Sequence, residues 1–136
     1  MKNIDWSQLS FSYTQTKALV YSRCIDGKWE TPTVTENFNI CLNSFAGIFH
    51  YAPSCFEGLK AFRGVDGRIR LFRPDKNAKR MADSATYLDM PYPSEEMFIN
   101  MCVQCVKENI DYLPPYEASG ASLYLRPILI GINPQL

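Results

Sequence analysis

Two residues in the segment SLYLRP, Tyr124 and Arg126, have types and a spacing that could do chemistry together. In an extended strand alternate residues point to the same face, so these two share one face and the neighbouring leucines take the other. An arginine fork can meet a carboxylate, directly or by orienting a tyrosine hydroxyl, and the phenol ring adds apolar surface beside it. The pair therefore suits the wall of a binding site. The competing interpretation is a solvent-facing pair on an exposed sheet face.

A further candidate, Arg80, belongs to the segment RPDKNAKRM, in which apolar residues recur at helical spacing. The pattern predicts a helix that starts at Pro74, because proline is well tolerated in a first turn without internal N–H partners. The apolar stripe of this helix consists of Ala78, Met81, Ala82, Ala85 and Leu88. At about 100° per residue, Arg80 lies about 160° or more from the mean direction of the stripe. Its guanidinium is expected to point away from the core, and a solvated surface arginine is the competing interpretation.

Turn signals place these residues on an antiparallel framework. Residues 17–25 are rich in strand-forming types and run into Asp26-Gly27, while residues 59–63 and 68–72 flank Asp66-Gly67. Asp-Gly is favoured where both turn residues need positive φ, so two hairpins are expected.

A second helix is expected from an N-cap at Ser94 to about Ile110, with acidic residues in the first turn, where they meet the positive end of the helix dipole. The proline pair at 114–115 opposes any continuation. A final strand over residues 121–130 completes the elements. The expected fold class is α+β, with a mostly antiparallel sheet and two main helices packed on it.

The composition argues against several classes of protein. With 46% hydrophobic residues in 136, the chain can bury a core as one domain, and 14 basic against 14 acidic side chains leave no net charge. That balance supplies no field that would attract nucleic acid or an anionic membrane. No apolar run reaches the roughly 18 to 20 residues of a membrane span, and the first residues lack signal-peptide features. A cytoplasmic protein is expected.

The five cysteines, at positions 24, 41, 55, 102 and 105, are expected to be reduced and partly buried. Cys102 and Cys105 form a CxxC pair, but no second pair accompanies them, and the only histidine, His50, is distant in sequence. A structural zinc ion normally takes four ligands, so no metal site is expected. Lys60 is expected to face solvent from a strand.

Two blocks of sequence carry a resemblance to a known family. The first runs from His50 to Met81 as HYAPSCFEGLKAFRGVDGRIRLFRPDKNAKRM, and the second is GASLYLRPILIGINPQL. Both resemble the N-terminal small domain of branched-chain amino acid aminotransferases, which are fold-type IV enzymes that use pyridoxal 5′-phosphate. The resemblance implies that residues 1–136 form this small domain. It also implies that a large domain with the Schiff-base lysine lies beyond Leu136, so the chain by itself is expected to hold no catalytic residue and to be inactive.

For Arg80, the resemblance implies a contact with the cofactor phosphate, because the family has its phosphate-binding arginine at this place in the RPDKNAKRM motif. Arg73, Lys76 and Lys79 are local competitors that spacing by itself does not exclude. The cofactor is not expected to be covalently bound to this chain.

The resemblance also assigns Tyr124 and Arg126 to the substrate pocket, close to the α-carboxylate. Tyr51 and Phe56, in HYAPSCFEG, are expected to line the hydrophobic part for a branched side chain, with Tyr51 reaching the site of a neighbouring subunit. Phe11 is a further candidate, although LSFSYTQTKAL agrees less closely with the family. Such a pocket discriminates modestly among aliphatic side chains, since each buried methylene contributes about 0.8 kcal/mol.

The implied reaction moves an amino group between L-leucine, L-isoleucine or L-valine and 2-oxoglutarate, in a protein expected to be a homodimer or larger. D-amino acid aminotransferases and aminodeoxychorismate lyases share the fold and are alternatives. Another alternative is a non-catalytic binding domain, in which Tyr124, Arg126 and Arg70 contact single-stranded nucleic acid. The neutral charge of the chain disfavours this last alternative.

Overall fold

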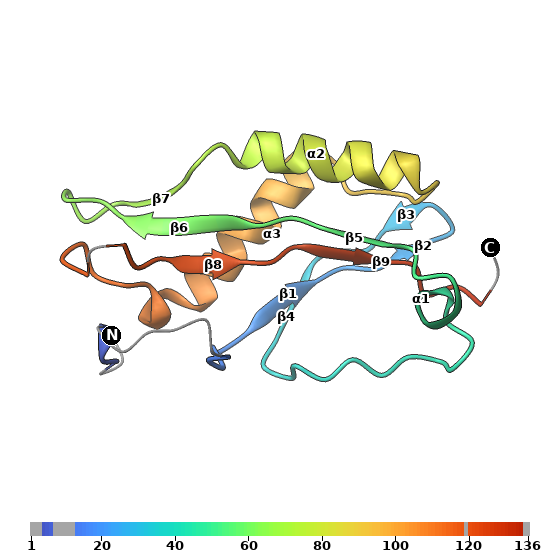
Figure 1. Ribbon diagram of the computed structural model, residues 1–136, viewed down its shortest axis with the longest axis horizontal. Coiled ribbons are helices and arrows are strands. Elements are labelled where there is room, and N and C mark those ends of the chain that lie inside the picture. Colours follow the sequence, from blue (N-terminus) through green and yellow to red (C-terminus); the bar gives the residue numbers. More distant parts are fainter. Residues whose placement is uncertain (1–3, 7–12, 119, 135–136) are drawn as a thin grey trace.

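The computed structural model describes residues 4–6, 13–118 and 120–134 of the chain (Figure 1). In chain order its elements are β1 (Leu19–Tyr21), β2 (Cys24–Ile25), β3 (Lys28–Trp29), β4 (Thr33–Thr35), α1 (Gly47–His50), β5 (Ser54–Phe56), β6 (Leu59–Arg63), β7 (Ile69–Leu71), α2 (Pro74–Tyr87), α3 (Glu95–Glu108), a 3₁₀ helix (Ile110–Tyr112), β8 (Leu123–Leu125) and β9 (Ile128–Ile130).

A long antiparallel ribbon forms the middle of the molecule (Figure 1). In this ribbon β5 pairs with β9 and β6 pairs with β8, and β7 adds a third strand beside β6. The residue pairs of the two ladders belong to one register, which sets Glu57 opposite Pro127 and Gly58 opposite Arg126.

The two ladders are separated by a short break at Pro127. The N–H of Glu57 donates to the carbonyl oxygen of Pro127 at 2.9 Å, but proline has no N–H with which to continue the ladder. The final strand predicted over residues 121–130 is therefore two strands, β8 and β9. Because the register is unchanged across the break, side chains on both sides of it still alternate between the same two faces.

The two faces of the ribbon have different environments. Leu59, Ala61 and Leu125 are buried in the core, whereas Phe56 and Tyr124 on the opposite face are exposed. Figure 1 shows α3 crossing behind β6 and β8, and α2 running along the ribbon beside β5 and β6. The helix residues that complete the core are Ala78, Met81, Phe98, Cys102 and Val106. The core thus lies on the helix side, and the other face carries aromatic and charged groups.

The N-terminal strands and the hairpins differ in detail from the predictions. The first predicted strand is divided, since β1 pairs with β4 while β2 forms its own hairpin with β3. Asp26 and Gly27 have φ of 50° and 74°, which confirms the predicted turn. The β6–β7 hairpin is also present, but only Gly67 of its Asp-Gly pair has positive φ. Its loop is longer than two residues, with the N–H of Gly64 donating to the carbonyl oxygen of Arg68.

Both predicted helices are present. α2 begins at Pro74, and Ser94 caps α3 by accepting a hydrogen bond from the N–H of Met97 at 3.1 Å. Two details were wrong: Leu88 follows α2 and is 42% exposed, and α3 ends earlier than predicted, at Glu108. The expected α+β class with two main helices is confirmed, although the strands form several small ladders. None of the helices in the described ranges is long and apolar enough to span a membrane.

Candidate functional site

An aromatic and cationic cluster occupies the exposed face of the ribbon. The guanidinium carbon of Arg126 lies 4.4 Å from the centre of the Phe56 ring and 5.2 Å from the centre of the Tyr124 ring. A cation at such a distance is attracted by the ring faces, which hold the arginine without using its N–H donors. The Phe56 and Tyr124 side chains are 63% and 48% exposed. The structure thus brings together three predicted site residues on one open face.

Gly58 packs against the Tyr124 ring of this cluster. It lies opposite Arg126, and a Cβ atom at this position would overlap the hydroxyl oxygen of Tyr124 and lie 3.1 Å from the Cζ atom of the same ring. The phenol therefore reaches from β8 across to the neighbouring strand, where a side chain is missing. Only glycine leaves this space, which is why a close approach is seen here.

Arg80 makes a two-pronged ion pair on the helix side of the same segment. Its Nε and Nη2 atoms each donate to a carboxylate oxygen of Glu57 at 2.6 Å. Asn77, one turn earlier on α2, donates from Nδ2 to Glu57 at 2.7 Å and to the carbonyl oxygen of Gly58 at 3.2 Å. These bonds attach α2 to the edge of the ribbon that β7 does not cover, since β7 pairs only with residues 61–63.

Glu57 is a buried charge with an exposed fraction of only 2%. Burial by itself raises the pKa of its carboxyl, but hydrogen bonds from Arg80 and Asn77, with the charge of Arg80, outweigh this effect. The net pKa of Glu57 therefore lies below its ordinary value, and the same pairing raises the pKa of Arg80. Glu57 is ionised at neutral pH and gives Arg80 a fixed counter-charge.

The predicted direction of Arg80 is correct, since its side chain is 68% exposed. The competing interpretation of a solvated surface arginine holds for its exposure, but the guanidinium is also bound by Glu57. A guanidinium has five N–H donors, and Glu57 takes one from Nε and one from Nη2. The two donors of Nη1 and the second donor of Nη2 are not used by Glu57. Nη1 and Nη2 are the two nitrogens with which an arginine can bind an anion through two parallel hydrogen bonds.

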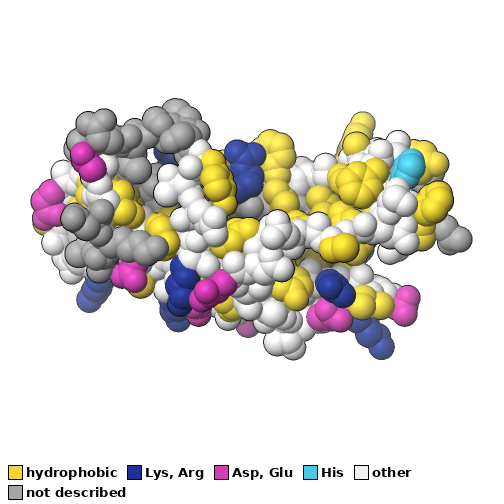
Figure 2. All heavy atoms as spheres, turned by 90° about the horizontal axis from the view of Figure 1, so that it is seen from below, with side chains coloured by type: hydrophobic (Ala, Val, Ile, Leu, Met, Phe, Trp, Pro, Cys, Tyr) yellow, Lys and Arg dark blue, Asp and Glu magenta, His cyan; other side chains and the backbone are white. Residues whose placement is uncertain are grey.

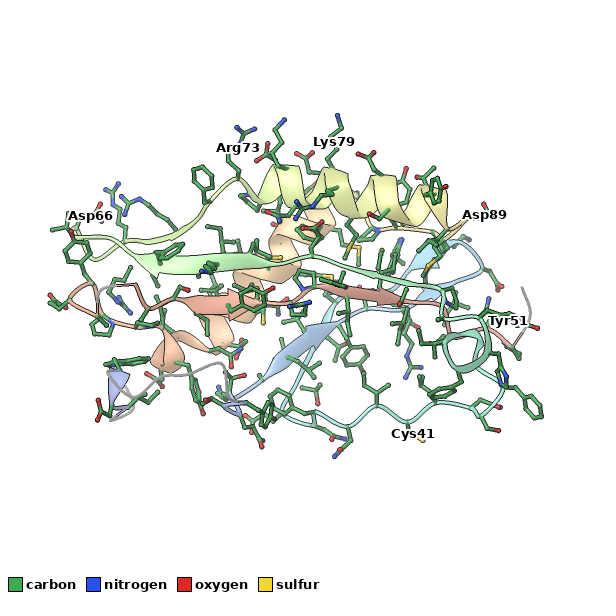
Figure 3. All side chains as sticks on the ribbon, viewed as in Figure 1. Cys41, Tyr51, Asp66, Arg73, Lys79 and Asp89 are labelled. Carbon is green, nitrogen blue, oxygen red and sulfur yellow. The ribbon has the colours of Figure 1, made fainter. Side chains whose placement is uncertain are left out.

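Of the local competitors of Arg80, Arg73 differs from it in its partner and Lys79 in its direction, whereas Lys76 lies beside it. Arg73 donates to both carboxylate oxygens of Asp75, at 3.1 and 2.9 Å. Figure 3 shows Arg73 and Lys79 projecting from the side of α2 that faces away from the strands. Lys76 lines an open hollow of about 370 Å³ together with Arg80. The full lining of this hollow is Phe72, Arg73, Lys76, Asn77 and Arg80.

Residues of α2 and residues of the aromatic cluster contact Gly58 from different sides. Asn77 binds the carbonyl oxygen of Gly58 from α2, and the ring of Tyr124 lies against the same residue on the exposed face. Glu57, which holds Arg80, is its neighbour in sequence. A segment of two residues therefore connects the arginine of α2 with the aromatic cluster.

Two predicted site residues are outside this arrangement. Tyr51 follows α1, and Figure 3 places it at the end of the molecule that carries this helix. It is 63% exposed, as are Phe45 and Phe49 to a similar degree, and Figure 2 shows hydrophobic side chains around the single histidine, His50, in this region. Phe11 lies outside the described residues, so the structure says nothing about it.

Neither Asn77 nor Glu57 was among the site residues predicted from the sequence. The spacing of three between Asn77 and Arg80, which puts both on one side of a helix, was the available signal. In the part of the chain that the structure describes, no three His, Cys, Asp or Glu side chains are grouped so that they could hold a metal ion.

Comparison with known proteins gives a consistent result, although no family model matches the chain. The chain is 45% identical over 133 residues to a branched-chain-amino-acid aminotransferase of Haemophilus influenzae, an alignment that covers 98% of the chain. It is 41% identical over 136 residues, its whole length, to a branched-chain-amino-acid aminotransferase of Helicobacter pylori. The chain belongs to the branched-chain aminotransferase family.

This branched-chain aminotransferase homologue spans only 38% and 40% of the length of those two relatives. A methionine aminotransferase of Arabidopsis thaliana is also related, with 36% identity over 98% of the chain and 38% of the relative. Because the chain covers well under half of each relative, their activities do not pass to it directly.

Solved structures confirm the fold. A branched-chain aminotransferase of Thermoproteus uzoniensis, determined with norvaline, matches 88% of the chain and 35% of its own length, with a TM-score of 0.58 and 22% identity. The Escherichia coli branched-chain aminotransferase matches 68% of the chain and 28% of its own length, with a TM-score of 0.55 and 22% identity. The α+β fold expected from the family resemblance is therefore that of part of these enzymes.

Proposed function

We propose that this chain is the small domain of a pyridoxal 5′-phosphate-dependent branched-chain aminotransferase, where it binds the cofactor phosphate and one side of the substrate. The observation that carries the proposal is that Arg80 binds Glu57 while the Arg126 cluster packs against the adjacent residue, Gly58. The relatives named above support it, since they are aminotransferases for branched-chain amino acids.

The residues present fit the phosphate of the cofactor. Arg80 keeps three N–H donors that Glu57 does not use, and Lys76 lines the same hollow, while the amide of Asn77 is bonded to Glu57 and Gly58. A dianionic phosphate is well matched by an arginine fork next to a second cation. When bound, the cofactor would supply the electron sink and carry the amino group, while the lysine that anchors it belongs to a part of the enzyme outside this chain.

On the exposed face, Arg126 and Tyr124 suit the carboxylate that amino acids and 2-oxo acids share. The rings of Phe56 and Tyr124 already hold the guanidinium, so its N–H groups can serve a ligand instead of a protein partner. Phe56 also offers apolar surface to an aliphatic side chain. Together these three residues would orient a substrate and exclude water from one side of it.

The remaining assignments extend the proposal to the whole protein. Tyr51 would contribute its ring to the site of a neighbouring subunit, which fits its exposed place at the α1 end of the molecule, away from β8, and the protein would then be a homodimer or larger. Phe11 would join the hydrophobic part of the pocket. The chain by itself would be inactive, because the anchoring lysine is supplied elsewhere.

A substrate screen with the full-length protein tests this function. Transfer of the amino group from L-leucine, L-isoleucine and L-valine to 2-oxoglutarate is expected, with L-methionine included because one relative is a methionine aminotransferase. Residues 1–136 assayed separately should give no turnover. Rapid turnover of D-alanine with none of L-leucine would contradict the proposal and favour a D-amino acid aminotransferase, and lyase activity on aminodeoxychorismate would favour the other alternative.

A further inference from the structure

We propose that Glu57 is a positioning residue that fixes the direction of the Arg80 fork, with Asn77 holding Glu57 in place. The inference rests on the proposed function, in which Arg80 binds the cofactor phosphate. It adds a role for two residues that do not themselves touch the cofactor.

The geometry of the ion pair supports this role. Glu57 contacts the Nε and Nη2 edge of the guanidinium, at 2.6 Å on each side, and so leaves the Nη1 and Nη2 edge pointing elsewhere. Because the guanidinium is planar, fixing one edge fixes the direction of the others. The carboxylate therefore orients the remaining donors and does not occupy them.

The surroundings of Glu57 make it a firm support. It is 2% exposed and lies between the β5–β9 and β6–β8 ladders. Because it is buried, its carboxylate has little freedom to move. Asn77 donates to one of its oxygens at 2.7 Å and also to the carbonyl oxygen of Gly58 at 3.2 Å, which fixes the carboxylate relative to the strand. An exposed arginine on a helix would otherwise sample many rotamers, and ordering it in advance strengthens ligand binding.

A purely structural ion pair that fastens α2 to the ribbon is the competing role. Loss of such a pair would weaken the fold, and with it the binding of every ligand alike. Loss of a positioning residue would weaken the binding of the phosphate in particular. The two roles are therefore separated by comparing a ligand that has the phosphate with one that lacks it.

The experiment measures dissociation constants of pyridoxal 5′-phosphate and of pyridoxal with the full-length apoprotein. The dissociation constant of pyridoxal divided by that of pyridoxal 5′-phosphate is the ratio that reports the phosphate contribution. Arg80→Ala should lower this ratio roughly 100-fold and Glu57→Gln roughly tenfold, in line with the strength of hydrogen bonds to charged groups. Arg80→Ala combined with Glu57→Gln should lower it no further than Arg80→Ala, because Glu57 acts through Arg80. Asn77→Ala, which removes one support of the carboxylate, should lower it about threefold.

The matched control is Asp66→Asn. This change removes another two-pronged arginine pair, in which Arg70 donates to Asp66 at 2.8 and 2.7 Å in the β6–β7 loop, away from α2. It should leave the ratio unchanged. Figure 3 shows Asp66 at the opposite end of the molecule from Tyr51, on the hairpin tip.

The outcomes separate this inference from the proposed function. If Arg80→Ala leaves the ratio unchanged, Arg80 does not bind the phosphate and both fail. If Arg80→Ala lowers the ratio while Glu57→Gln and Asn77→Ala do not, only the positioning role is overturned. Equal weakening of both ligands by Glu57→Gln, or a further loss in the Arg80→Ala background, would also overturn it. Should Glu57→Gln fail to fold, Asn77→Ala still decides.

Discussion

Gly58 and its neighbour Glu57 are the residues on which the account depends most closely. Strand alternation was sufficient to predict that Tyr124 and Arg126 share a face, because that inference needs only two residues on one strand. The partner of Arg80 was beyond sequence reasoning, since Glu57 lies 23 positions away and meets it only when α2 packs along the ribbon. Pairing across such a distance depends on tertiary structure, which local patterns do not contain.

Substitution of Gly58 by alanine should disturb the exposed face of the ribbon, where the proposed function places the substrate. The added methyl group would overlap the hydroxyl of Tyr124, and the ring is too rigid to avoid it without leaving its place over the strand. We expect the free energy of unfolding to fall by about 1–3 kcal/mol and the KM for the 2-oxo acid to rise. Urea unfolding and steady-state kinetics measure the two effects.

Gly64→Ala is a suitable control for this change. A Cβ at Gly64 would meet the Nη1 end of Arg70 and the Oδ1 end of Asp66, two paired and exposed side-chain ends that can shift together. We expect an effect below about 0.5 kcal/mol and unchanged kinetics. Equal effects of the two substitutions would show that the contact with Tyr124 is unimportant.

Glu57 predicts a specific pH dependence of stability. Its pKa is lowered in the folded protein from an ordinary value of 4.5, so its stabilising contribution is complete above that value and is lost as the pH falls through the folded pKa. Glu57→Gln should cost about 1–2 kcal/mol at pH 7, a figure reduced because Arg80 is largely solvated. Urea unfolding from pH 7 to pH 3 should show this difference shrinking below about pH 4.5. A difference that stays constant over this range would contradict the assignment.

At the scale of elements, the helices were more predictable than the strands. Proline at the start of α2 and Ser94 at the N-cap of α3 act locally, and both signals were read correctly. The final strand was predicted too long, because Pro127, which has no N–H for the ladder, was not taken as the point where it divides into β8 and β9. For the loop before β7, positive φ was expected at both Asp66 and Gly67, but only Gly67 has it, since Asp-Gly fits several hairpin geometries.

Asn109 links two of these elements and was not singled out from the sequence. It is 3% exposed, its Oδ1 accepts from the N–H groups of Lys17 and Ala18 at 2.9 and 3.0 Å, and its Nδ2 donates to the carbonyl oxygens of Ala18 and Cys105, each at 2.8 Å. Asn109 therefore attaches the chain entering β1 to the end of α3.

Removing this link should weaken the attachment of β1. Asn109→Ala leaves buried backbone groups without partners, so we expect a loss of about 2–4 kcal/mol in the free energy of unfolding. Amide hydrogen exchange should accelerate at Ala18 and along β1, while Asn100→Ala, an exposed change on the same helix, should leave exchange unaltered. Slow exchange at Ala18 in the Asn109→Ala variant would disprove the link.

For the whole molecule, the sequence predicted the fold class and the family, and the structure adds the arrangement of the site. The ribbon has a buried face against the helices and an exposed face with Phe56, Tyr124 and Arg126. The chain spans about two fifths of the length of its relatives, and in the proposed function this open face is the side that would contact the rest of the enzyme. Tyr51, at a different end, fits a contribution to another copy of the protein.

The most direct measurement is a crystal structure of the full-length protein with pyridoxal 5′-phosphate. The account predicts phosphate oxygens within about 3 Å of the Nη atoms of Arg80, with Glu57 still paired to the opposite edge of the guanidinium. Arg126 and Tyr124 should line the same cavity from the exposed face of the ribbon. A phosphate bound by other residues, with Arg80 directed into solvent, would contradict the account.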